Sequence, residues 1–487
     1  MSNFVDFGGR PFHFIGIGGI GMSALAYVLA KRQLPVSGSD LRPNHITRKL
    51  ESIGTHIFGT QEASNLGFFV SSESANRVLL NSQEILPTVT KSTLPQVICS
   101  TAINANNLEY KAALELGCPI FHRSDVLAAL ICDYRSIAVA GTHGKTTTSS
   151  MIGYMLLQAG LDPTILVGGE VNAWEGNARL GQSEYLVAEA DESDGSLVKH
   201  APEIGIITNI ELDHPDHYDT LEEVIDIFQT FASSCKTVIG SIDCETVRDR
   251  LKPTITYSLN PETEADYTVS NIEYRHDGTT ALVLEKGKAL GVLKLRLLSR
   301  HNLSNALAAV AVGRVVGLEF GAIAKGIATF EGARRRFEFR GEVDGITFID
   351  DYAHHPSEIR VTLAAARLQA RPGQRVVAIF QPHRYSRTLT FLEEFAESFT
   401  YADLVVLTDI YSAGEPNLGQ ISGEQLAAEI AKQHPQVLYQ PNLSLMSEFL
   451  LQTLRPGDLA LFLGAGNLNQ VIPEIITTLC EPATATS

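Results

Sequence analysis

One stretch near the end of the first third of the chain constrains the fold more than any other. Residues 136–140 form an apolar, β-prone run, and Gly141 and Gly144 follow in a tight turn that leads into Lys145 and three threonines. A helix-favouring segment, residues 149–158, comes next. This order predicts a strand, a phosphate-binding loop and a helix, in which backbone N–H groups and the positive end of the helix bind an anion.

The predicted loop has the short form Gly-x-x-Gly-Lys-Thr, because Val139 stands where the longer phosphate-loop pattern carries a further glycine. In such a loop Lys145 reaches the outer phosphates and Thr146 offers its hydroxyl group to Mg2+. The alternative is an ordinary turn between a strand and a helix, in which Lys145 is merely solvated. The agreement of strand, glycines, Lys-Thr order and helix favours the phosphate loop.

Length and composition limit the classes of protein that remain. A chain of 487 residues exceeds what one hydrophobic core supports, so we expect two to four domains. Lys and Arg number 38 and Asp and Glu 55, and the resulting net charge of −17 argues against nucleic acid as the main partner. An anionic ligand must therefore be met by local positive groups.

The sequence also predicts the compartment. No run of about twenty apolar residues occurs, and the first ten residues lack the features of a secretory signal. The six cysteines are scattered and predict unpaired thiols in a reducing compartment. We therefore expect a cytoplasmic protein without stable membrane insertion, and the number of its subunits stays open.

A second glycine-rich turn lies near the N-terminus. An apolar strand at residues 12–15 leads into the glycines of residues 16–21 and then into a helical pattern at 22–31. A second strand, at 35–38, ends near Asp40, at the spacing of the ribose-binding acid of a Rossmann unit. Alone this pattern predicts NAD, but the same turn suits the diphosphate of a UDP-sugar, and a plain packing turn is a third interpretation.

Further strands and helices complete a first domain, which we place at residues 1–133. A strand is predicted at 96–102, a helix at 107–117 and another short strand at 119–121. The polar stretch 71–92 carries no pattern that predicts an element.

Two acidic clusters follow predicted strands of the central region. The strand at 185–188 leads into the carboxylates of 189–194, and the strand at 205–210 leads into the acidic segment 211–217. Ligands of open α/β sheets bind at the carboxyl ends of strands, and a magnesium nucleotide needs hard oxygen ligands. The clusters therefore predict a metal site, with His214 as a ligand; a solvated acidic turn and a buried packing histidine are the alternatives.

The central domain, which we place at residues 134–333, continues with a change of pattern. Alternating residues from 267 to 298 predict a meander of antiparallel strands, and an alanine-rich helix is expected at 306–316. Asn302 suits the N-cap of this helix, and Asn305 would add polarity to its first turn.

A third domain, which we place at residues 334–487, is expected to be another parallel α/β unit. Its strands are predicted at 347–349, 375–380, 404–408 and 459–463. The strand-end loops at 350–356 and 381–388 concentrate histidine and arginine, and Arg384 and Arg387 can each bind a carboxylate in a bidentate fork. A solvated basic loop is the alternative, and the tail 481–487 is expected to be disordered.

Together these motifs resemble those of one family, the Mur ligases of cell-wall precursor synthesis. The matching segments lie in all three predicted domains and in the family's order: residues 14–23, 141–148, 189–194, 209–214, 301–305, 336–337, 350–356 and 381–388. The resemblance implies an α/β protein of three domains: a Rossmann-like N-terminal domain for a UDP-sugar, a P-loop central ATPase domain, and a Rossmann-like C-terminal domain for an amino acid.

The implied reaction is the ATP-dependent joining of L-alanine to the carboxylate of UDP-N-acetylmuramate through an acyl phosphate, with ADP and phosphate released. The implied cofactors are ATP and Mg2+. A carboxylate is a poor electrophile, and its phosphorylation needs charge neutralisation, which Lys145 and Mg2+ would supply. Gln229 stands where ligases of later amino acids carry a modified lysine, which fits the alanine-adding branch of the family.

The resemblance also assigns residues to roles by position. The implied ATP-binding residues are Gly141, Thr142, His143, Gly144, Lys145, Thr146, Thr147, Asn302, Asn305, Arg336 and Asp351. The implied metal ligands are Thr146, Glu189 and His214. The implied UDP-sugar site is Gly18, Gly19, Ile20, Gly21, Asp40, Ser100 and Thr101, and the implied L-alanine site is Tyr352, His354, His383, Arg384 and Arg387. The expected catalytic residues are Lys145, Glu189, His214, His354 and His383, with the choice between the last two as proton acceptor left open.

Three rival functions remain at this stage. A sibling ligase that attaches a recycled tripeptide to the same UDP-sugar would share the motifs of the first two domains. An NAD-dependent oxidoreductase would explain the N-terminal glycine turn with Asp40, but it would leave the phosphate loop without a role. A nucleotide-binding regulator would bind ATP without turnover.

Overall fold

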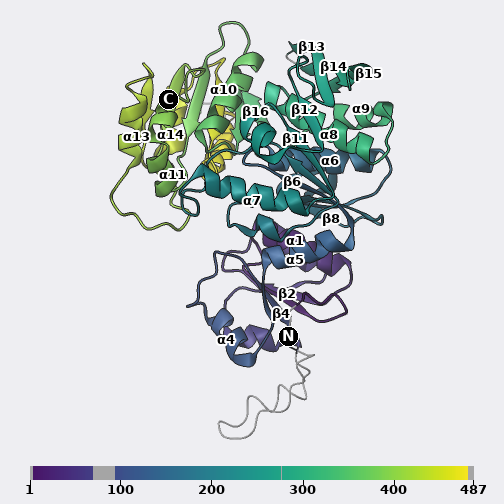
Figure 1. Ribbon diagram of the computed structural model, residues 1–487. Coiled ribbons are helices and arrows are strands. Elements are labelled where there is room, and N and C mark those ends of the chain that lie inside the picture. Colours follow the sequence, from purple (N-terminus) through teal and green to yellow (C-terminus); the bar gives the residue numbers. More distant parts are fainter. Residues whose placement is uncertain (1–3, 70–93, 276, 481–487) are drawn as a thin grey trace, which may run out of the picture.

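The computed structural model describes residues 4–69, 94–275 and 277–480. Three sheets with their helices follow one another along the chain (Figure 1): the N-terminal sheet lies below the central one in this view, and the C-terminal sheet lies beside it. The polar stretch 71–92, for which no element was predicted, lies outside the described residues. The tail 481–487, which was predicted to be disordered, also lies outside them.

The N-terminal sheet has the order β3-β2-β1-β4-β5, with all neighbours parallel. Its strands are β1 (Phe12–Ile15), β2 (Val36–Ser39), β3 (His56–Phe58), β4 (Gln96–Cys99) and β5 (Ile120–His122), and its α-helices are α1 (Ile20–Lys31), α2 (His45–Ser52), α4 (Leu108–Leu116) and α5 (Arg123–Asp133). The chain reverses its direction of winding between β1 and β4. Ligands of such sheets bind at this switch point, which is where the glycine turn and Ser100 lie.

The central sheet has the order β15-β14-β13-β12-β11-β10-β6-β9-β7-β8. Its parallel part contains β6 (Arg135–Ala140), β7 (Thr164–Val171), β9 (Tyr185–Glu189), β10 (Ile204–Ile207), β11 (Thr237–Ser241) and β12 (Ile255–Ser258), with β8 (Gly176–Arg179) antiparallel at the edge. Its α-helices are α6 (Lys145–Gln158), α7 (Leu221–Ser234), α8 (Arg300–Val315) and α9 (Phe320–Ala328). The predicted strand, loop and helix are confirmed, and β6 lies between β9 and β10, the two strands that end in acidic clusters.

The helix after the phosphate loop begins at Lys145, four residues earlier than the pattern predicted. Threonine and serine have modest helix propensity, so the sequence placed them in the loop. Thr148, Ser149 and Ser150 are fully buried, so tertiary packing overrides that preference.

The predicted meander is confirmed as β13 (Tyr267–Arg275), β14 (Gly278–Glu285) and β15 (Lys288–Leu295), paired antiparallel. The predicted N-cap was wrong. Helix α8 begins at Arg300, and its N-cap is Ser299, whose hydroxyl accepts a hydrogen bond from the backbone N–H of Asn302 at 3.4 Å. The Asn302 side chain instead donates to the carbonyl oxygen of Leu298 at 2.9 Å.

The C-terminal sheet has the order β16-β17-β21-β18-β19-β20. Its strands are β16 (Glu338–Val343), β17 (Ile346–Asp351), β18 (Val376–Phe380), β19 (Leu404–Leu407), β20 (Val437–Tyr439) and β21 (Leu459–Leu463). Its α-helices are α10 (Pro356–Gln369), α11 (Tyr385–Thr390), α12 (Leu392–Ala396), α13 (Gly423–Ile430), α14 (Met446–Thr453) and α15 (Val471–Cys480). The parallel unit is as predicted, with one addition: β16 pairs antiparallel with β17 at the edge.

All six cysteines are free thiols, as the sequence predicted. Among the described helices, none combines the length and the apolar character that a membrane crossing requires.

Candidate functional site

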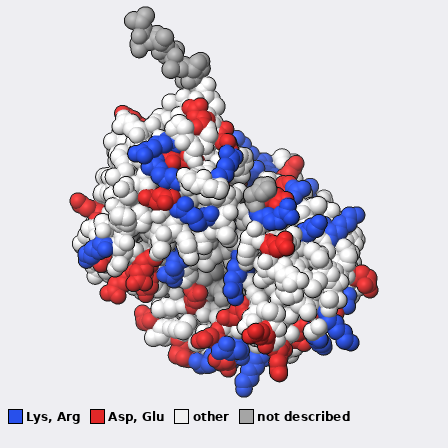
Figure 2. Space-filling model, turned by 90° about the horizontal axis from the view of Figure 1, so that it is seen from above, with Lys and Arg blue, Asp and Glu red and all other residues white. Residues whose placement is uncertain are grey.

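A cleft of about 1140 Å³ is lined by residues from the segments around all three sheets. The N-terminal wall contains Gly19, Ile20, Gly21, Ser100 and Thr101. The central wall contains Thr142, Gly144, Lys145, Thr146, Glu189 and His214. The C-terminal wall contains Arg336, Tyr352, His354, His383, Arg384 and Arg387. Seen from above the molecule, basic and acidic side chains are interspersed over the surface (Figure 2).

The remaining predicted site residues lie outside this lining. They are Gly18, Asp40, Gly141, His143, Thr147, Asn302, Asn305 and Asp351. The contacts of several of them show how they support the walls.

The phosphate loop is shaped by two glycines at the end of the buried strand β6. Gly141 has φ of 136°, and a Cβ atom there would lie 2.0 Å from the hydroxyl oxygen of Thr208. Gly144 has φ of 83°, and a Cβ atom there would lie 2.9 Å from the side-chain oxygen of Asn305. Only glycine fits these positions without strain. Helix α6 therefore begins at the cleft, and the unpaired N–H groups of its first turn are available to an anion.

Lys145 is held by a carboxylate that the sequence did not single out. Its Nζ donates to the carbonyl oxygens of Gly141 at 2.7 Å and Thr142 at 3.1 Å, and to both carboxylate oxygens of Glu192 at 2.9 Å. Burial would lower the pKa of Lys145, but the charges of Glu192 and Asp191 raise it above its usual range. Lys145 is therefore a permanent cation.

Glu189 ends strand β9, whereas Thr146 and His214 belong to the segments that follow the neighbouring strands β6 and β10. The Thr146 hydroxyl donates to Glu189 Oε1 at 3.1 Å, and Glu189 Oε2 accepts from the backbone N–H of Gly168 at 2.7 Å. Burial lowers the pKa of His214, so its ring is neutral at pH 7 and offers a lone pair. The oxygen donors Thr146 and Glu189 and the imidazole of His214 line the same cleft as the phosphate loop, and this set of donors fits a divalent cation such as Mg2+.

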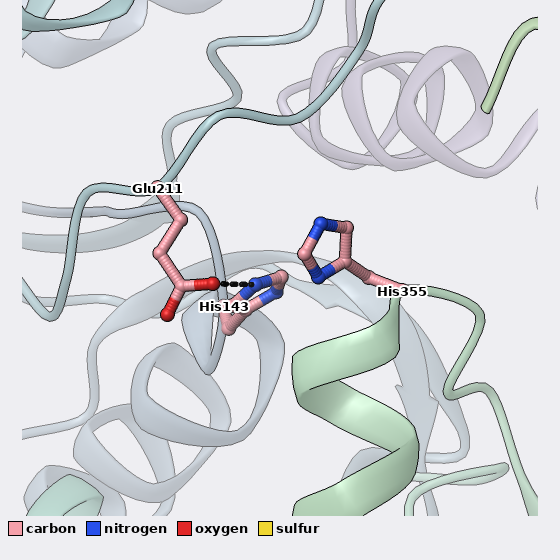
Figure 3. Close-up of side chains that lie close together, drawn as sticks. All are labelled: His143, Glu211 and His355. Carbon is pink, nitrogen blue, oxygen red and sulfur yellow. Dashed lines mark ion pairs between the residues drawn. The ribbon is translucent and has the colours of Figure 1, made fainter. Parts of the chain in front are cut away.

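His143, Glu211 and His355 form a second cluster beside the phosphate loop, with potential ligand atoms within 4.8 Å of one another (Figure 3). His143 Nε2 lies 3.4 Å from Glu211, and its Nδ1 lies 3.4 Å from Glu358. Burial opposes the charged ring, but both carboxylates favour it and raise the pKa of His143 to about 10. Nδ1 of His355 accepts from the backbone N–H of Ser357 as the N-cap of α10. These groups are therefore engaged as an imidazolium between carboxylates and as a helix cap.

Asp40 and Asp351 bind backbone N–H groups. Asp40 accepts from Gly18 at 2.8 Å and from Arg42 at 2.9 Å, so it holds the glycine turn in place. Asp351 accepts from Phe337 at 2.7 Å and from Ala353 at 2.8 Å. Burial raises the pKa of Asp351 to about 6.

Arg123, at the start of α5, is a cation that the sequence analysis missed. It lines the cleft, and a Cβ atom at Gly21 would lie 3.3 Å from its NH1. Its NH2 donates to Asp191 at 3.2 Å and to Asp194 at 3.0 Å. It follows a short strand of the N-terminal sheet, and this strand-end position was the available signal.

The two predicted carboxylate-binding arginines are already paired with carboxylates of the chain. Arg387 is 1% exposed, and its Nε and NH2 donate to Asp213 Oδ1 at 2.9 and 2.8 Å. Arg384 NH1 donates to Asp216 at 2.5 Å and to Glu415 at 3.4 Å. Asp213 and Asp216 belong to the segment between β10 and α7, so these pairs fasten the C-terminal wall to the central domain.

His354 and His383 face each other across the C-terminal wall, with ring centroids 5.5 Å apart and planes at 68°. Burial lowers the pKa of His354 to about 3 and that of His383 to about 2. Both rings are therefore neutral at pH 7. Tyr352 packs edge-on against His354, with centroids 5.4 Å apart.

The fold and the cleft together define a multidomain nucleotide-dependent enzyme, and comparison with known proteins gives its family. The model described as "Mur ligase family, catalytic domain" matches residues 11–135, "Mur ligase middle domain" matches 139–313, and "Mur ligase, glutamate ligase domain" matches 335–466. The chain belongs to the Mur ligase family. The predicted three-domain α/β class is thereby confirmed.

Individual relatives narrow the comparison further. A protein of Nostoc punctiforme named UDP-N-acetylmuramate--L-alanine ligase is 87% identical over 487 residues and covers 100% of both chains. A protein of Nostoc sp. with the same name is 85% identical, again over 100% of both chains. The crystal structure of UDP-N-acetylmuramate-alanine ligase from Thermotoga maritima is 27% identical, covers 96% of this chain and 98% of its own, and superposes with a TM-score of 0.78.

Proposed function

We propose that this chain joins L-alanine to the carboxylate of UDP-N-acetylmuramate at the expense of ATP, releasing ADP and phosphate, in the synthesis of peptidoglycan precursors. The observation that carries this function is the full-length identity of 87% to a ligase of that name. The cleft supports it, because groups for a nucleotide, a metal and an amino acid converge there from three sheets. The cytoplasm is the proposed compartment, since ATP and UDP-sugars are found there.

The central wall is suited to the first chemical step. The carboxylate oxygen of the sugar attacks the γ-phosphate of ATP and forms an acyl phosphate, and the negative charge must be neutralised. Lys145 and the N–H groups of the first turn of α6 supply positive charge at fixed positions. Thr146, Glu189 and His214 would hold Mg2+, which adds further neutralisation when it is bound.

The nucleotide residues behind the central wall have supporting roles in the proposal. The side chain of Asn305 packs against Gly144 and would hold the phosphate loop in position. Asn302 fixes the turn before α8 by its hydrogen bond to Leu298. Arg336 NH2 lies 3.5 Å from the Thr146 hydroxyl and can reach the same phosphates. His143, Thr147 and Asp351 complete the proposed ATP site.

The N-terminal wall is proposed to hold the UDP-sugar. The N–H groups of Gly18 and Gly19 are donated within the turn, to Asp40 and to the carbonyl oxygen of Gly16, so the N–H groups of Ile20 and Gly21 at the start of α1 would form the anion site for its diphosphate. Asp40 stabilises that turn through Gly18 rather than touching the sugar, and Ser100, Thr101 and Arg123 extend the wall.

The C-terminal wall is proposed to bind L-alanine. Arg384 and Arg387 would donate hydrogen bonds to its carboxylate, and each would give up part of its present contact with Asp216 or Asp213. Tyr352, His354 and His383 would surround its amino group. The proposed domain bounds, 1–133, 134–333 and 334–487, are supported by the sheets, whose first and last strand residues are 12 and 122, 135 and 295, and 338 and 463.

The test is ADP release by the purified protein with ATP, Mg2+ and UDP-N-acetylmuramate, with and without L-alanine. The expected result is alanine-dependent ADP release together with a product heavier by one alanyl residue. ADP release with a tripeptide but not with alanine would identify the recycling sibling. Absence of ADP release with either amino substrate would overturn the proposal.

A further inference from the structure

The hydrogen bonds of the two cleft histidines distinguish their roles. Nδ1 of His354 lies 3.0 Å from the carbonyl oxygen of Tyr352 and 3.3 Å from Glu358 Oε2, and both partners can only accept. The neutral ring of His354 therefore carries its proton on Nδ1, which leaves the lone pair on Nε2.

His383 has the opposite arrangement. Its Nδ1 lies 3.2 Å from NH1 of Arg387, which can only donate, so Nδ1 of His383 accepts and its proton is on Nε2. A ring in this form cannot accept a proton from a substrate through Nε2. Of the two candidate bases that the sequence left open, His354 is the one with a free acceptor in the cleft.

Glu358 sits between His354 and the phosphate loop. It is an N3 residue of α10, its side chain is 14% exposed, and its Oε1 lies 3.4 Å from Nδ1 of His143. Its Oε2 accepts from the backbone N–H of His354 at 3.0 Å and lies 3.3 Å from Nδ1 of the same residue. One carboxylate thus contacts a nucleotide-loop side chain with one oxygen and an amino-acid-wall histidine with the other.

The surrounding groups keep this carboxylate in place. Arg336 NH1 lies 3.9 Å from Oε1 of Glu358, and the neighbouring Ser357 donates to Glu211 at 2.7 Å. Glu211 in turn faces His143, as Figure 3 shows. Around Glu358 the described charged and titratable groups include His143, His354 and Arg336, and Glu211 lies one step further. His301, His355 and Asp351 are also close enough to interact with it electrostatically. Burial would raise the pKa of Glu358, but its interactions with His354, His143 and Arg336 hold it well below its usual range.

We propose that Glu358 is a positioning residue of the ligase reaction, which fixes His354 as the acceptor of the amino substrate's proton and ties this ring to the phosphate loop through His143. The inference rests on the proposed function. The ammonium of L-alanine transfers one proton to Nε2 of His354, and its freed lone pair forms the C–N bond. The C–O bond to phosphate breaks, and the second proton of the attacking nitrogen leaves with the phosphate. The negative charge of Glu358 stabilises the imidazolium formed on His354.

The kinetic test uses Glu358→Gln, which keeps an oxygen for the helix cap but removes the charge. We expect kcat for alanine-dependent product formation to fall about tenfold or more, and His354→Gln to lower it about 100-fold or more. Because Glu358 acts through His354, Glu358→Gln should have no further effect in the His354→Gln background. KM for ATP should stay within about twofold.

Glu223→Gln is the matched control, because Glu223 is the N3 residue of the capping box of α7, and wild-type kcat is expected. Unchanged kcat in Glu358→Gln would overturn the proposal. An equal further loss on adding Glu358→Gln to His354→Gln would overturn it as well, since the residue would then act independently of the ring.

A second measurement does not depend on turnover. Nitrogen NMR of histidine-labelled protein reports which ring nitrogen is protonated. We expect His354 in the Nδ1–H form in the wild type, with a shift toward the Nε2–H form in Glu358→Gln. An unchanged tautomer in Glu358→Gln, or an Nε2–H form in the wild type, would contradict the proposal even if the protein proved to have another activity.

Discussion

The central wall and the C-terminal wall of the cleft differ in the charge state of their basic side chains. On the central wall, Lys145 is paired with Glu192 and remains charged, and beside it His143 is charged between two carboxylates. On the C-terminal wall, His354 and His383 are buried as neutral rings. A permanent cation suits a phosphate, whose charge must be neutralised throughout the reaction, whereas a neutral ring suits an ammonium group, which must lose a proton. The comparison supports the proposal that different sides of one cleft serve the two chemical steps.

The largest expected effect comes from removing the cation of the central wall. Lys145→Ala should lower kcat about a thousandfold or more, because the phosphoryl group loses a fixed positive charge in its transition state. ADP release under saturating substrates measures it. Lys236→Ala, at a lysine whose side chain is 80% exposed, is the control and should behave as the wild type. Activity within tenfold of wild type for Lys145→Ala would break the comparison.

The same substitution should also affect stability, since it leaves Glu192 buried without its partner. We expect Lys145→Ala to lower the free energy of unfolding by about 3 kcal/mol. Lys145→Ala combined with Glu192→Gln should recover part of this loss, because no uncompensated charge remains. Denaturant unfolding of the three proteins measures it, and a double variant less stable than Lys145→Ala would contradict the pairing.

A smaller effect is expected from the arginines of the C-terminal wall. Arg387→Lys keeps the charge but loses the planar fork, so KM for L-alanine should rise about 10- to 100-fold with little change in KM for ATP. Arg384→Lys should have a weaker effect, because the Arg384 side chain is 31% exposed whereas that of Arg387 is 2% exposed. Steady-state kinetics with varied alanine measures both, and the reverse order of the two variants would refute this account of the wall.

The two walls should also respond oppositely to pH. His143 has a folded pKa of about 10 against about 6.5 when unfolded, so its stabilising effect is complete below pH 6.5 and is lost as the pH rises toward 10. His354 has a folded pKa of about 3, so its burial increasingly costs stability as the pH falls from 6.5 toward 3. Each trend has an upper limit of about 1.4 kcal/mol per pH unit.

Unfolding of wild type, His143→Asn and His354→Gln across this pH range measures the trends. The stability advantage of the wild type over His143→Asn should shrink above pH 6.5. The stability of the wild type relative to His354→Gln should fall below pH 6.5. If the stability difference between wild type and His143→Asn and that between wild type and His354→Gln changed with pH in the same direction, the two histidines would not differ as described.

The smallest expected effect lies outside both walls. Asp40→Asn keeps one acceptor for the backbone N–H groups of Gly18 and Arg42 but removes the charge. We expect KM for UDP-N-acetylmuramate to rise about three- to tenfold, with KM for ATP and for alanine unchanged. Glu51→Gln, at an exposed residue of the same domain, is the control. An effect on KM for ATP would show that the N-terminal turn is not separate from the central wall.

The sequence predicted those parts of the fold that depend on residues close together in the chain. The phosphate loop, the glycine turn after β1 and the parallel strands were all predicted, because buried strands, glycines and helix ends leave signals within a few residues. The start of α6 and the N-cap of α8 were misplaced, since burial of Thr148 and the geometry of Ser299 decided them. The antiparallel pairing of β16 was not foreseen.

The partners of the site residues could not be predicted in the same way. Lys145, His354 and Arg387 were predicted as site residues. Glu192 and Asp213 were predicted only as members of two acidic clusters and Glu358 was not predicted, although each of the three contacts one of those site residues. Arg387 and Asp213 are far apart in the sequence and meet only through the packing of two domains. A carboxylate in an acidic run gives no sign of which cation it will face.

The most direct test of the two-wall account separates the two steps. Exchange of oxygen isotope between the bridging and non-bridging positions of ATP, measured with Mg2+ and UDP-N-acetylmuramate but without alanine, reports acyl-phosphate formation alone. The account predicts that Arg387→Lys retains this exchange at close to the wild-type rate while amide formation falls, and that Lys145→Ala loses both. Equal loss of exchange in Arg387→Lys and Lys145→Ala would contradict the assignment of each step to its own wall.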